Sequence, residues 1–417
     1  MDKFPSGVEP EAFARELDRL ELVSRLAETS RNLFDEGPHL ISTAELPWGD
    51  TVRELAIEVT RRFIHGETWI TGGGAREMEA EIVQWMGGLL GAPEPAGFLT
   101  SGGSESNMCA ILTAKRRAGR RGGSVVFPDN GHYSLYKLCH MFDLDPIAVP
   151  APAGQLHLVD PEAIEAAIRP DTIAIIATAG TWAYGSIDPI EAMGEIALRH
   201  GLYLHVDGAF GGYILPFLER SGYDRNIAPW DFRVPGVCSI SADLHKNGMA
   251  PPPAGSLYFR DASLLALAKE ICPPNGTMTG TRGTGPIAGA WTMVKLLGEA
   301  GYTAVSLKSM AMRDEIVRGV GEIDGVDVYP GSQINMSLIY SDTLDLRPVA
   351  EELRGRGWMF AARAIPAPVG VVVVPMPHND GQIPAFLDDL REAVKSAPAL
   401  PDSTAEADLE KVSSYGF

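Results

Sequence analysis

Three short motifs place reactive side chains beside small residues. In the first, two glycines lie within Ser101–Ser104, immediately before a predicted helix. Glycines let the backbone approach a ligand closely, and the N-terminus of a helix attracts a phosphate. In the second motif Asp207 ends an apolar run, and in the third Lys246 follows another such run. Taken singly, these residues are typical of a helix cap, a turn and a surface lysine.

Together, the three motifs predict a binding site for pyridoxal 5'-phosphate. The helix N-terminus would bind the phosphate, Asp207 would pair with the protonated pyridine nitrogen, and Lys246 would form a Schiff base with the aldehyde. Partial burial lowers the pKa of a lysine, which makes its amine a better nucleophile toward a carbonyl. His132 begins a predicted helix between the first two motifs, where its ring can stack on the cofactor.

In their order and spacing, these motifs resemble the group II pyridoxal-phosphate-dependent decarboxylases of fold type I, a family that includes the sphingosine phosphate lyases. The resemblance covers about residues 70–395 of the chain. The segments that carry it are Thr100–Ser106, His132, Ala179–Thr181, Gly185–Asp188, His205–Ala209 and Ala242–Lys246.

The resemblance implies a role for each matching residue. Lys246, Asp207 and His132 would be the catalytic residues. The implied cofactor-binding residues are Gly102, Gly103, Ser104, His132, Thr181, Asp207, Ala209, Ser241, His245, Lys246, Thr281 and Arg282. The last two resemble a loop that reaches the phosphate of the neighbouring subunit, so the resemblance also implies a homodimer with shared active sites.

The residues after the lysine indicate a branch of the family. The segments Asn247–Gly255 and Pro375–His378 are similar to those of the archaeal-type tyrosine and aspartate decarboxylases. The phosphate lyases carry a second lysine that grips the substrate phosphate, at the position where this chain has Pro252. The resemblance therefore implies a carbon–carbon lyase that decarboxylates a small L-amino acid.

Two departures from the family pattern bear on the substrate. Val372 stands where the decarboxylases hold the substrate α-carboxylate with an arginine, and Arg363 is the nearest replacement. Trp69 lies in a segment that differs from the usual substrate-access sequence. The candidate substrate contacts are Trp69, Tyr184 and Arg363. Two alternatives stay open: aldol-type cleavage of the Cα–Cβ bond of a β-hydroxy amine or amino acid, and a cofactor-binding homologue without turnover.

Short apolar runs alternate with helical patterns up to about residue 300, which favours an α/β domain with a mostly parallel sheet. The resemblance implies a fold type I, aminotransferase-like architecture, with a seven-stranded sheet and a small C-terminal α+β domain. The predicted divisions are an N-terminal helical segment 1–50, a large cofactor-binding domain 51–300, a small domain 301–397 and a polar tail 398–417. Strands are predicted over 98–100, 124–127, 172–178, 202–206, 237–241, 255–259, 326–329, 336–340 and 369–375, and helices over 9–28, 76–90, 132–142, 188–199, 262–271, 301–319, 346–356 and 383–396, with one more starting near 104.

Charge and composition disfavour several other classes of protein. The 417 residues include 54 acidic and 35 basic ones, and a net charge of −19 disfavours binding to nucleic acids or anionic membranes. No apolar run approaches the roughly 20 residues that span a bilayer, and no signal peptide is recognisable, so we expect a cytoplasmic protein. The 4 cysteines predict reduced thiols. The sequence contains no HExxH, GxSxG or P-loop motif, so no metal site is predicted and hydrolase chemistry is disfavoured.

Overall fold

The computed structural model describes residues 31–32, 51–66, 73–152, 156–223, 227–271, 276–363 and 370–400. The predicted helix 9–28, the candidate substrate contact Trp69 and most of the predicted tail lie outside these residues. Within the described ranges, no helix is both long and apolar enough to cross a membrane.

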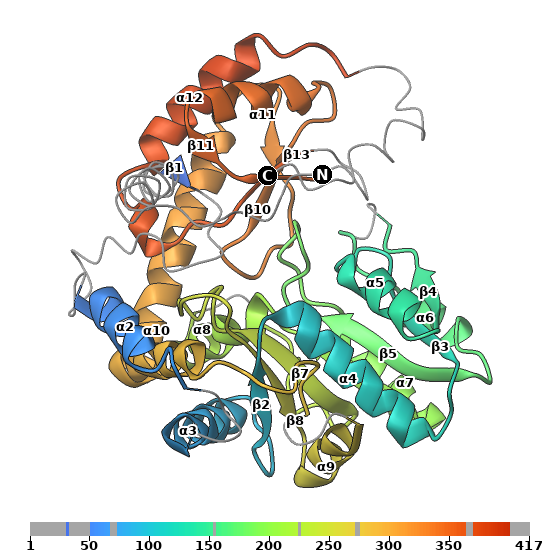
Figure 1. Ribbon diagram of the computed structural model, residues 1–417. Coiled ribbons are helices and arrows are strands. Elements are labelled where there is room, and N and C mark those ends of the chain that lie inside the picture. The colour runs from blue at the N-terminus through green and yellow to red at the C-terminus, as the bar shows by residue number, and fades with distance from the viewer. Residues whose placement is uncertain are drawn as a thin grey trace, which may run out of the picture.

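A seven-stranded sheet forms the centre of the larger part of the chain (Figure 1). In spatial order its strands are β2 (Ala96–Thr100), β8 (Gly255–Phe259), β7 (Val237–Asp243), β6 (Tyr203–Asp207), β5 (Thr172–Thr178), β3 (Ser124–Pro128) and β4 (Asp145–Val149). Strand β8 is antiparallel to both of its neighbours, and all other neighbouring strands are parallel. The predicted α/β class with a mostly parallel sheet is confirmed.

Helices cover both faces of this sheet. Successive side chains of a strand point to opposite faces, so neighbouring residues of one strand pack against different helices. Ile176 of β5 packs in the same core as Ile111 of α4 (Gly103–Ala118). Its neighbour Ile175 packs in the core that contains Met193 of α7 (Ile190–His200). The other elements around the sheet are α2 (Thr51–Arg62), α3 (Gly73–Leu89), α5 (Ser134–Met141), α6 (Pro161–Ala166), η2 (Gly211–Tyr213), α8 (Leu215–Arg220) and α9 (Ala262–Ile271).

A long helix, α10 (Thr284–Val320), leads from the large sheet to the C-terminal elements (Figure 1). It is interrupted at Gly298, whose φ of 56° is not helical. The helix predicted over 301–319 therefore covers only the part of α10 after this glycine. The predicted domain boundary at residue 300 falls inside α10, close to the same interruption.

The C-terminal elements form a smaller α+β unit, as predicted. Its antiparallel sheet has the order β12 (Ala361–Arg363), β13 (Gly370–Val373), β10 (Ser337–Tyr340) and β9 (Asp327–Val328). The helices α11 (Leu346–Gly355) and α12 (Ile383–Lys395) pack against it, and η3 (Pro377–Asn379) precedes α12. A separate parallel pair joins β1 (Arg31–Asn32) to β11 (Trp358–Met359).

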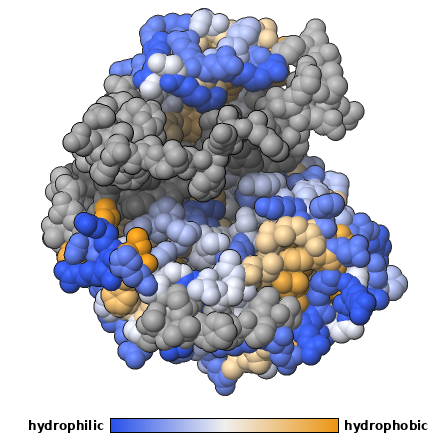
Figure 2. Space-filling view, in the orientation of Figure 1, coloured by the Kyte–Doolittle hydropathy of each residue, from blue (hydrophilic) through white to orange (hydrophobic). Residues whose placement is uncertain are grey.

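The two helices of the smaller unit are amphipathic. Leu353 of α11 and Phe386 of α12 are fully buried in its core. Figure 2 shows that hydrophilic residues dominate the outer surface over these helices. The apolar faces of α11 and α12 therefore fix them on the small sheet.

Val372 occupies a core position in this small sheet. It lies on β13, pairs with Leu338 of β10 and is fully buried among apolar side chains. The position where the resemblance leads us to expect an arginine is thus occupied by a packing residue. Arg363 ends β12, opposite Gly370.

Candidate active site

A cavity of about 270 Å³ lies at the carboxyl ends of three neighbouring parallel strands. Thr178, Asp207 and Asp243 are the last residues of β5, β6 and β7, and all three line it. Parallel sheets bind ligands at this edge. The remaining lining residues are Ser101, Gly102, Gly103, Ser104, Glu105, Asn107, His132, Tyr133, Gly180, Trp182, Ala209, Phe210, His245 and Lys246.

The N-terminus of α4 forms one wall of the cavity. The helix begins at Gly103 with Gly102 as its N-cap, so Ser104 lies in the first turn and does not cap the helix. The first backbone N–H groups of a helix have no partners within it, so this wall offers donors to an anion. A Cβ on Gly102 would come within 3.0 Å of Cε1 of His245, so this glycine permits the close approach of the two segments.

Asp207 is held by three donors. Nδ2 of Asn107 donates to its Oδ2 at 2.7 Å, and the Ser241 hydroxyl and the Ala209 N–H each donate to Oδ1 at 3.1 Å. Burial raises the pKa of this carboxyl, but the charge on His132 and the hydrogen bond from Asn107 outweigh that effect and bring the pKa below its ordinary value. Asp207 is therefore a buried, ionised carboxylate.

Lys246 lies in the same cavity. Its Nζ is 3.2 Å from Oδ2 of Asp243 and 4.2 Å from the centre of the Phe210 ring. Asp243 is only 1% exposed, so this ion pair is enclosed by protein. The primary amine and its carboxylate partner are thus brought together at the end of β7 and the turn that follows.

Two histidines complete the polar lining. Nδ1 of His245 accepts from the Ala254 N–H at 3.1 Å, and its Nε2 lies 3.7 Å from Oδ2 of Asp243. Nδ1 of His132 accepts from the Ser134 N–H at 3.3 Å. Because a backbone donor binds Nδ1 in each ring, the neutral form of each His carries its proton on Nε2.

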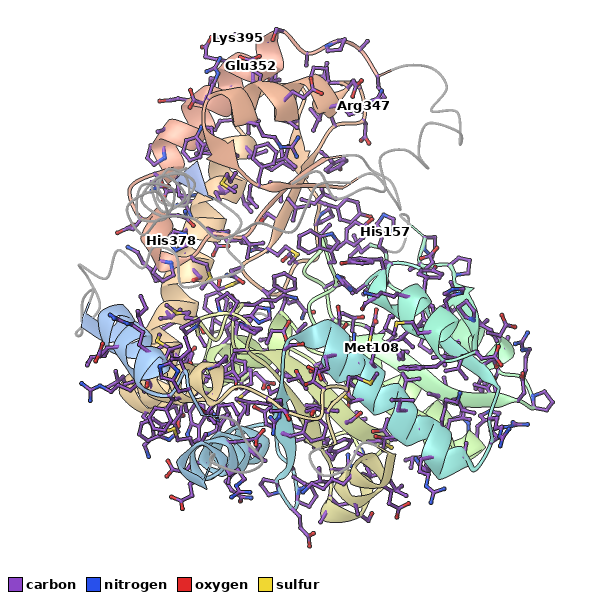
Figure 3. The ribbon with its side chains drawn as sticks, in the orientation of Figure 1. Met108, His157, Arg347, Glu352, His378 and Lys395 are labelled. Atoms are coloured by element: carbon purple, nitrogen blue, oxygen red, sulfur yellow. The ribbon has the colours of Figure 1, made fainter. Side chains whose placement is uncertain are left out.

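Several predicted residues lie behind or beside the lining. The Ser241 hydroxyl supports Asp207, and the buried Thr181 hydroxyl lies 2.6 Å from that of Ser186. Tyr184 stacks on His157 with ring centres 4.3 Å apart, and in Figure 3 His157 lies between α5 and the small sheet. The structure therefore does not bring Thr181 or Tyr184 to the cavity lining, and their proposed contacts with cofactor and substrate stay predictions.

Thr281 and Arg282 line a second cavity of about 190 Å³, which shares Ser101 and Glu105 with the first. Nη2 of Arg282 donates to Glu79 at 3.0 Å, and Nη1 donates to the Leu99 carbonyl at 2.7 Å. Within this chain Arg282 is thus bonded to its own large sheet. The role of this loop at a neighbouring subunit stays a prediction.

Nine lining residues were not among the site residues predicted from the sequence: Ser101, Glu105, Asn107, Tyr133, Thr178, Gly180, Trp182, Phe210 and Asp243. Two signals were available. Asn107 comes four residues after Gly103, so it lies on the same face of the helix. Asp243 ends a strand in the same way as Asp207, which marks both for the same edge of the sheet.

These residues fit pyridoxal phosphate. An ionised carboxylate suits the protonated pyridine nitrogen, a primary amine suits the aldehyde, and the N-terminus of α4 with His245 suits the phosphate. Asp207 and Lys246 both line one cavity, as a single bound ring would require.

Comparisons with known proteins agree with this arrangement. Residues 66–322 match the family model described as the pyridoxal-dependent decarboxylase conserved domain. A probable L-aspartate decarboxylase from Pyrococcus abyssi is 32% identical over 408 residues, which cover 95% of this chain and all of the relative. A probable L-tyrosine/L-aspartate decarboxylase from Methanothermobacter thermautotrophicus is 32% identical over 76% of this chain and 87% of its own length.

Solved structures show the same fold. The sphingosine-1-phosphate lyase from Burkholderia pseudomallei matches with a TM-score of 0.83 and 27% identity, over 95% of this chain and 93% of the lyase. The Lactobacillus brevis glutamate decarboxylase matches with a TM-score of 0.77 and 21% identity, over 95% and 94%. The fold type I architecture and the enzyme class, a pyridoxal-phosphate-dependent amino acid decarboxylase, are confirmed as predicted. The chain belongs to the pyridoxal-dependent decarboxylase family.

Proposed function

We propose that this chain removes the α-carboxylate of a small L-amino acid, with L-aspartate and L-tyrosine as the first candidates. The single observation that carries the proposal is that Lys246, Asp207 and the N-terminus of α4 line one cavity. The names of relatives about 32% identical over most of the chain support these two substrates. When bound, pyridoxal phosphate accepts the electron pair that is released as the carboxylate leaves.

Each residue has a task that follows from its position. Asp207, ionised and held by three donors, keeps a proton on the pyridine nitrogen and so favours electron withdrawal. Lys246 would hold the cofactor through its aldehyde. In the structure the Lys246 Nζ lies 3.2 Å from Oδ2 of Asp243, a distance at which the amine and this carboxylate can exchange a proton. The ring of His132 lines the cavity and would stack on the cofactor.

The substrate side of the cavity is partly aromatic. Trp182 and Phe210 stack with ring centres 5.6 Å apart, and both line the cavity together with Tyr133. Among the described residues, the lining contains no arginine. Arg363 is our proposed candidate for holding the α-carboxylate, because an arginine can make a bidentate contact with a carboxylate.

The test is a substrate panel on the cofactor-loaded protein. L-aspartate, L-tyrosine and L-glutamate are supplied separately, and carbon dioxide and amine are measured in the same samples. We expect one of the first two to release carbon dioxide and amine in equal amounts. Lys246→Ala should abolish release, whereas Lys269→Ala, which changes an exposed lysine of α9, should not. Full activity in Lys246→Ala would overturn the proposal.

Aldol-type cleavage is the second candidate. It is favoured by the likeness to the sphingosine-1-phosphate lyase and by the burial of Val372 in the core. The same panel therefore includes β-hydroxy amino acids and a phosphorylated amino alcohol, with aldehyde as the readout. Aldehyde without carbon dioxide would support this second candidate. A cofactor-binding homologue without turnover would give neither product, and no amino acid would change its absorption spectrum.

A further inference from the structure

A row of buried polar side chains extends behind Asp207, away from the cavity. Asn107 of α4 donates to Asp207 at 2.7 Å, and Oδ1 of Asn107 lies 2.9 Å from Nε2 of His205. Nδ1 of His205 lies 2.8 Å from the Ser239 hydroxyl. Asn107, His205 and Ser239 are each at most 1% exposed. Three elements, α4, β6 and β7, thus meet in one hydrogen-bonded chain.

The ionised state of Asp207 determines which atom donates and which accepts in each hydrogen bond of this row. An ionised carboxylate only accepts hydrogen bonds, so the Asn107 amide must point its NH₂ group at Asp207. Its carbonyl oxygen then faces His205, which must donate from Nε2. A neutral His that donates from Nε2 accepts at Nδ1, so the Ser239 hydroxyl donates to it.

His205 is neutral in this arrangement. Burial lowers its pKa to about 4, although the charge of Asp207 and a hydrogen bond with the Ser239 backbone act in the opposite direction. Because the neutral ring carries only one proton, the hydrogen bonds of this row have a single donor-to-acceptor direction. The amide of Asn107 lies between this ring and Asp207. Because an amide does not titrate, it fixes the direction of the hydrogen bonds and does not transfer a proton between the two groups.

We propose that Asn107, oriented by a neutral His205, is a positioning residue that keeps Asp207 ionised and correctly aimed at the pyridine nitrogen. The proposal rests on the role proposed above for Asp207. Asn107 supplies one of the three donors on this carboxylate, on an oxygen that neither Ser241 nor Ala209 contacts. Without it, Oδ2 would lose a charge-assisted hydrogen bond in a buried site.

The first test compares Asn107→Leu with Thr113→Val, a matched control. Thr113 lies on the same helix, is equally buried, and donates to the Cys109 carbonyl at 2.8 Å, outside the cavity. Two readouts are taken: the dissociation constant of pyridoxal phosphate from fluorescence titration, and the pH at which the visible absorption of the bound cofactor changes. We expect Asn107→Leu to weaken cofactor binding about tenfold or more. It should also shift the pH transition, and Thr113→Val should change neither readout.

The second test separates orientation from packing at His205. His205→Gln keeps a donor near the position of Nε2 and should retain most of the cofactor affinity, whereas His205→Leu removes the donor and should behave like Asn107→Leu. Ser239→Ala, at the far end of the chain, should shift the pH transition in the same direction by a smaller amount. If the leucine variants do not fold, the result for Ser239→Ala decides whether this row of hydrogen bonds influences Asp207.

The outcomes distinguish this proposal from the function on which it rests. If Asn107→Leu folds and matches Thr113→Val in both readouts, Asn107 does not position Asp207. Equal effects of His205→Gln and His205→Leu would overturn the part assigned to His205. If the wild-type protein shows no visible absorption that depends on Lys246, the proposed cofactor role of this site fails instead, whatever the Asn107 variants do.

Discussion

Lys246 and Asp243 form an enclosed ion pair, with Nζ of the lysine 3.2 Å from Oδ2 of the aspartate. Asp243 ends β7, and Lys246 lies in the turn that follows it. Among the described residues, Oδ1 of Asp243 has no hydrogen-bond partner. The positive charge nearest to this carboxylate is that of Lys246, because Nε2 of His245 lies farther away, at 3.7 Å from Oδ2.

Breaking this pair should destabilise the cofactor-free protein. Removing one partner of a buried ion pair costs about 3 kcal/mol, so Asp243→Asn should lower the free energy of unfolding by about that amount. Adding Lys246→Met should recover most of the loss, because no unpaired charge then remains buried. Urea unfolding of both single variants and the double variant measures the coupling, and a value below about 0.5 kcal/mol would show that the pair is not coupled.

Asp207→Asn should lower kcat at least about a hundredfold, because an amide places no negative charge beside the pyridine nitrogen. Asp231→Asn is the matched control. Asp231 is also a buried carboxylate, but it accepts from Arg233 at 2.7 Å and does not line the cavity. Steady-state rates at saturating cofactor measure the effect. Similar losses in both variants would mean that Asp207 acts only through stability.

The regular elements of the large sheet could be predicted from the sequence, and several of their bounds agree with the structure. Strands β5 and β8 and helix α9 have the predicted limits, because each is an uninterrupted apolar run or helical pattern. Strand β4 was not predicted. It begins with Asp145-Pro146, and it lies at the edge of the sheet, where proline is tolerated and less burial is needed. Its pattern is therefore weak.

The candidate site was only partly predictable. Asp207 and Lys246 stand out because each follows an apolar strand beside small residues. The bond between Asn107 and Asp207 joins positions 100 residues apart, and that between Asn107 and His205 joins positions 98 apart. Periodicity and local motifs describe only near neighbours, so they carry no information about such pairs. Asp243 is different, because it lies only three residues before Lys246 and ends a strand, so the sequence did carry a signal for it.

Asp188 should make stability depend on pH. Burial raises its pKa from 3.8 to about 7, although the Thr178 N–H acts in the opposite direction. Between these two values the folded protein binds a proton that the unfolded chain releases, so this carboxyl contributes less stability as pH rises from about 4 to 7. Asp188→Asn should remove that contribution, and its advantage over the wild type should grow from pH 5 to pH 8.

Urea unfolding at both pH values checks this prediction. Asparagine can still accept the Thr178 N–H, which donates to Asp188 at 2.7 Å, so the local backbone contact is retained. The quantity of interest is the difference between variant and wild type, because other titrating groups cancel in it. A difference that is equal at the two pH values would contradict a raised pKa for Asp188.

The central claim is that Lys246 is the residue that bonds the cofactor. The most direct measurement is to mix the protein with pyridoxal phosphate, reduce it with borohydride and locate the modified lysine by peptide mass spectrometry. We predict that the added mass lies on Lys246, and that Lys246→Ala carries none in the cavity. A modification on another lysine in the wild-type protein, with Lys246 unmodified, would contradict the account.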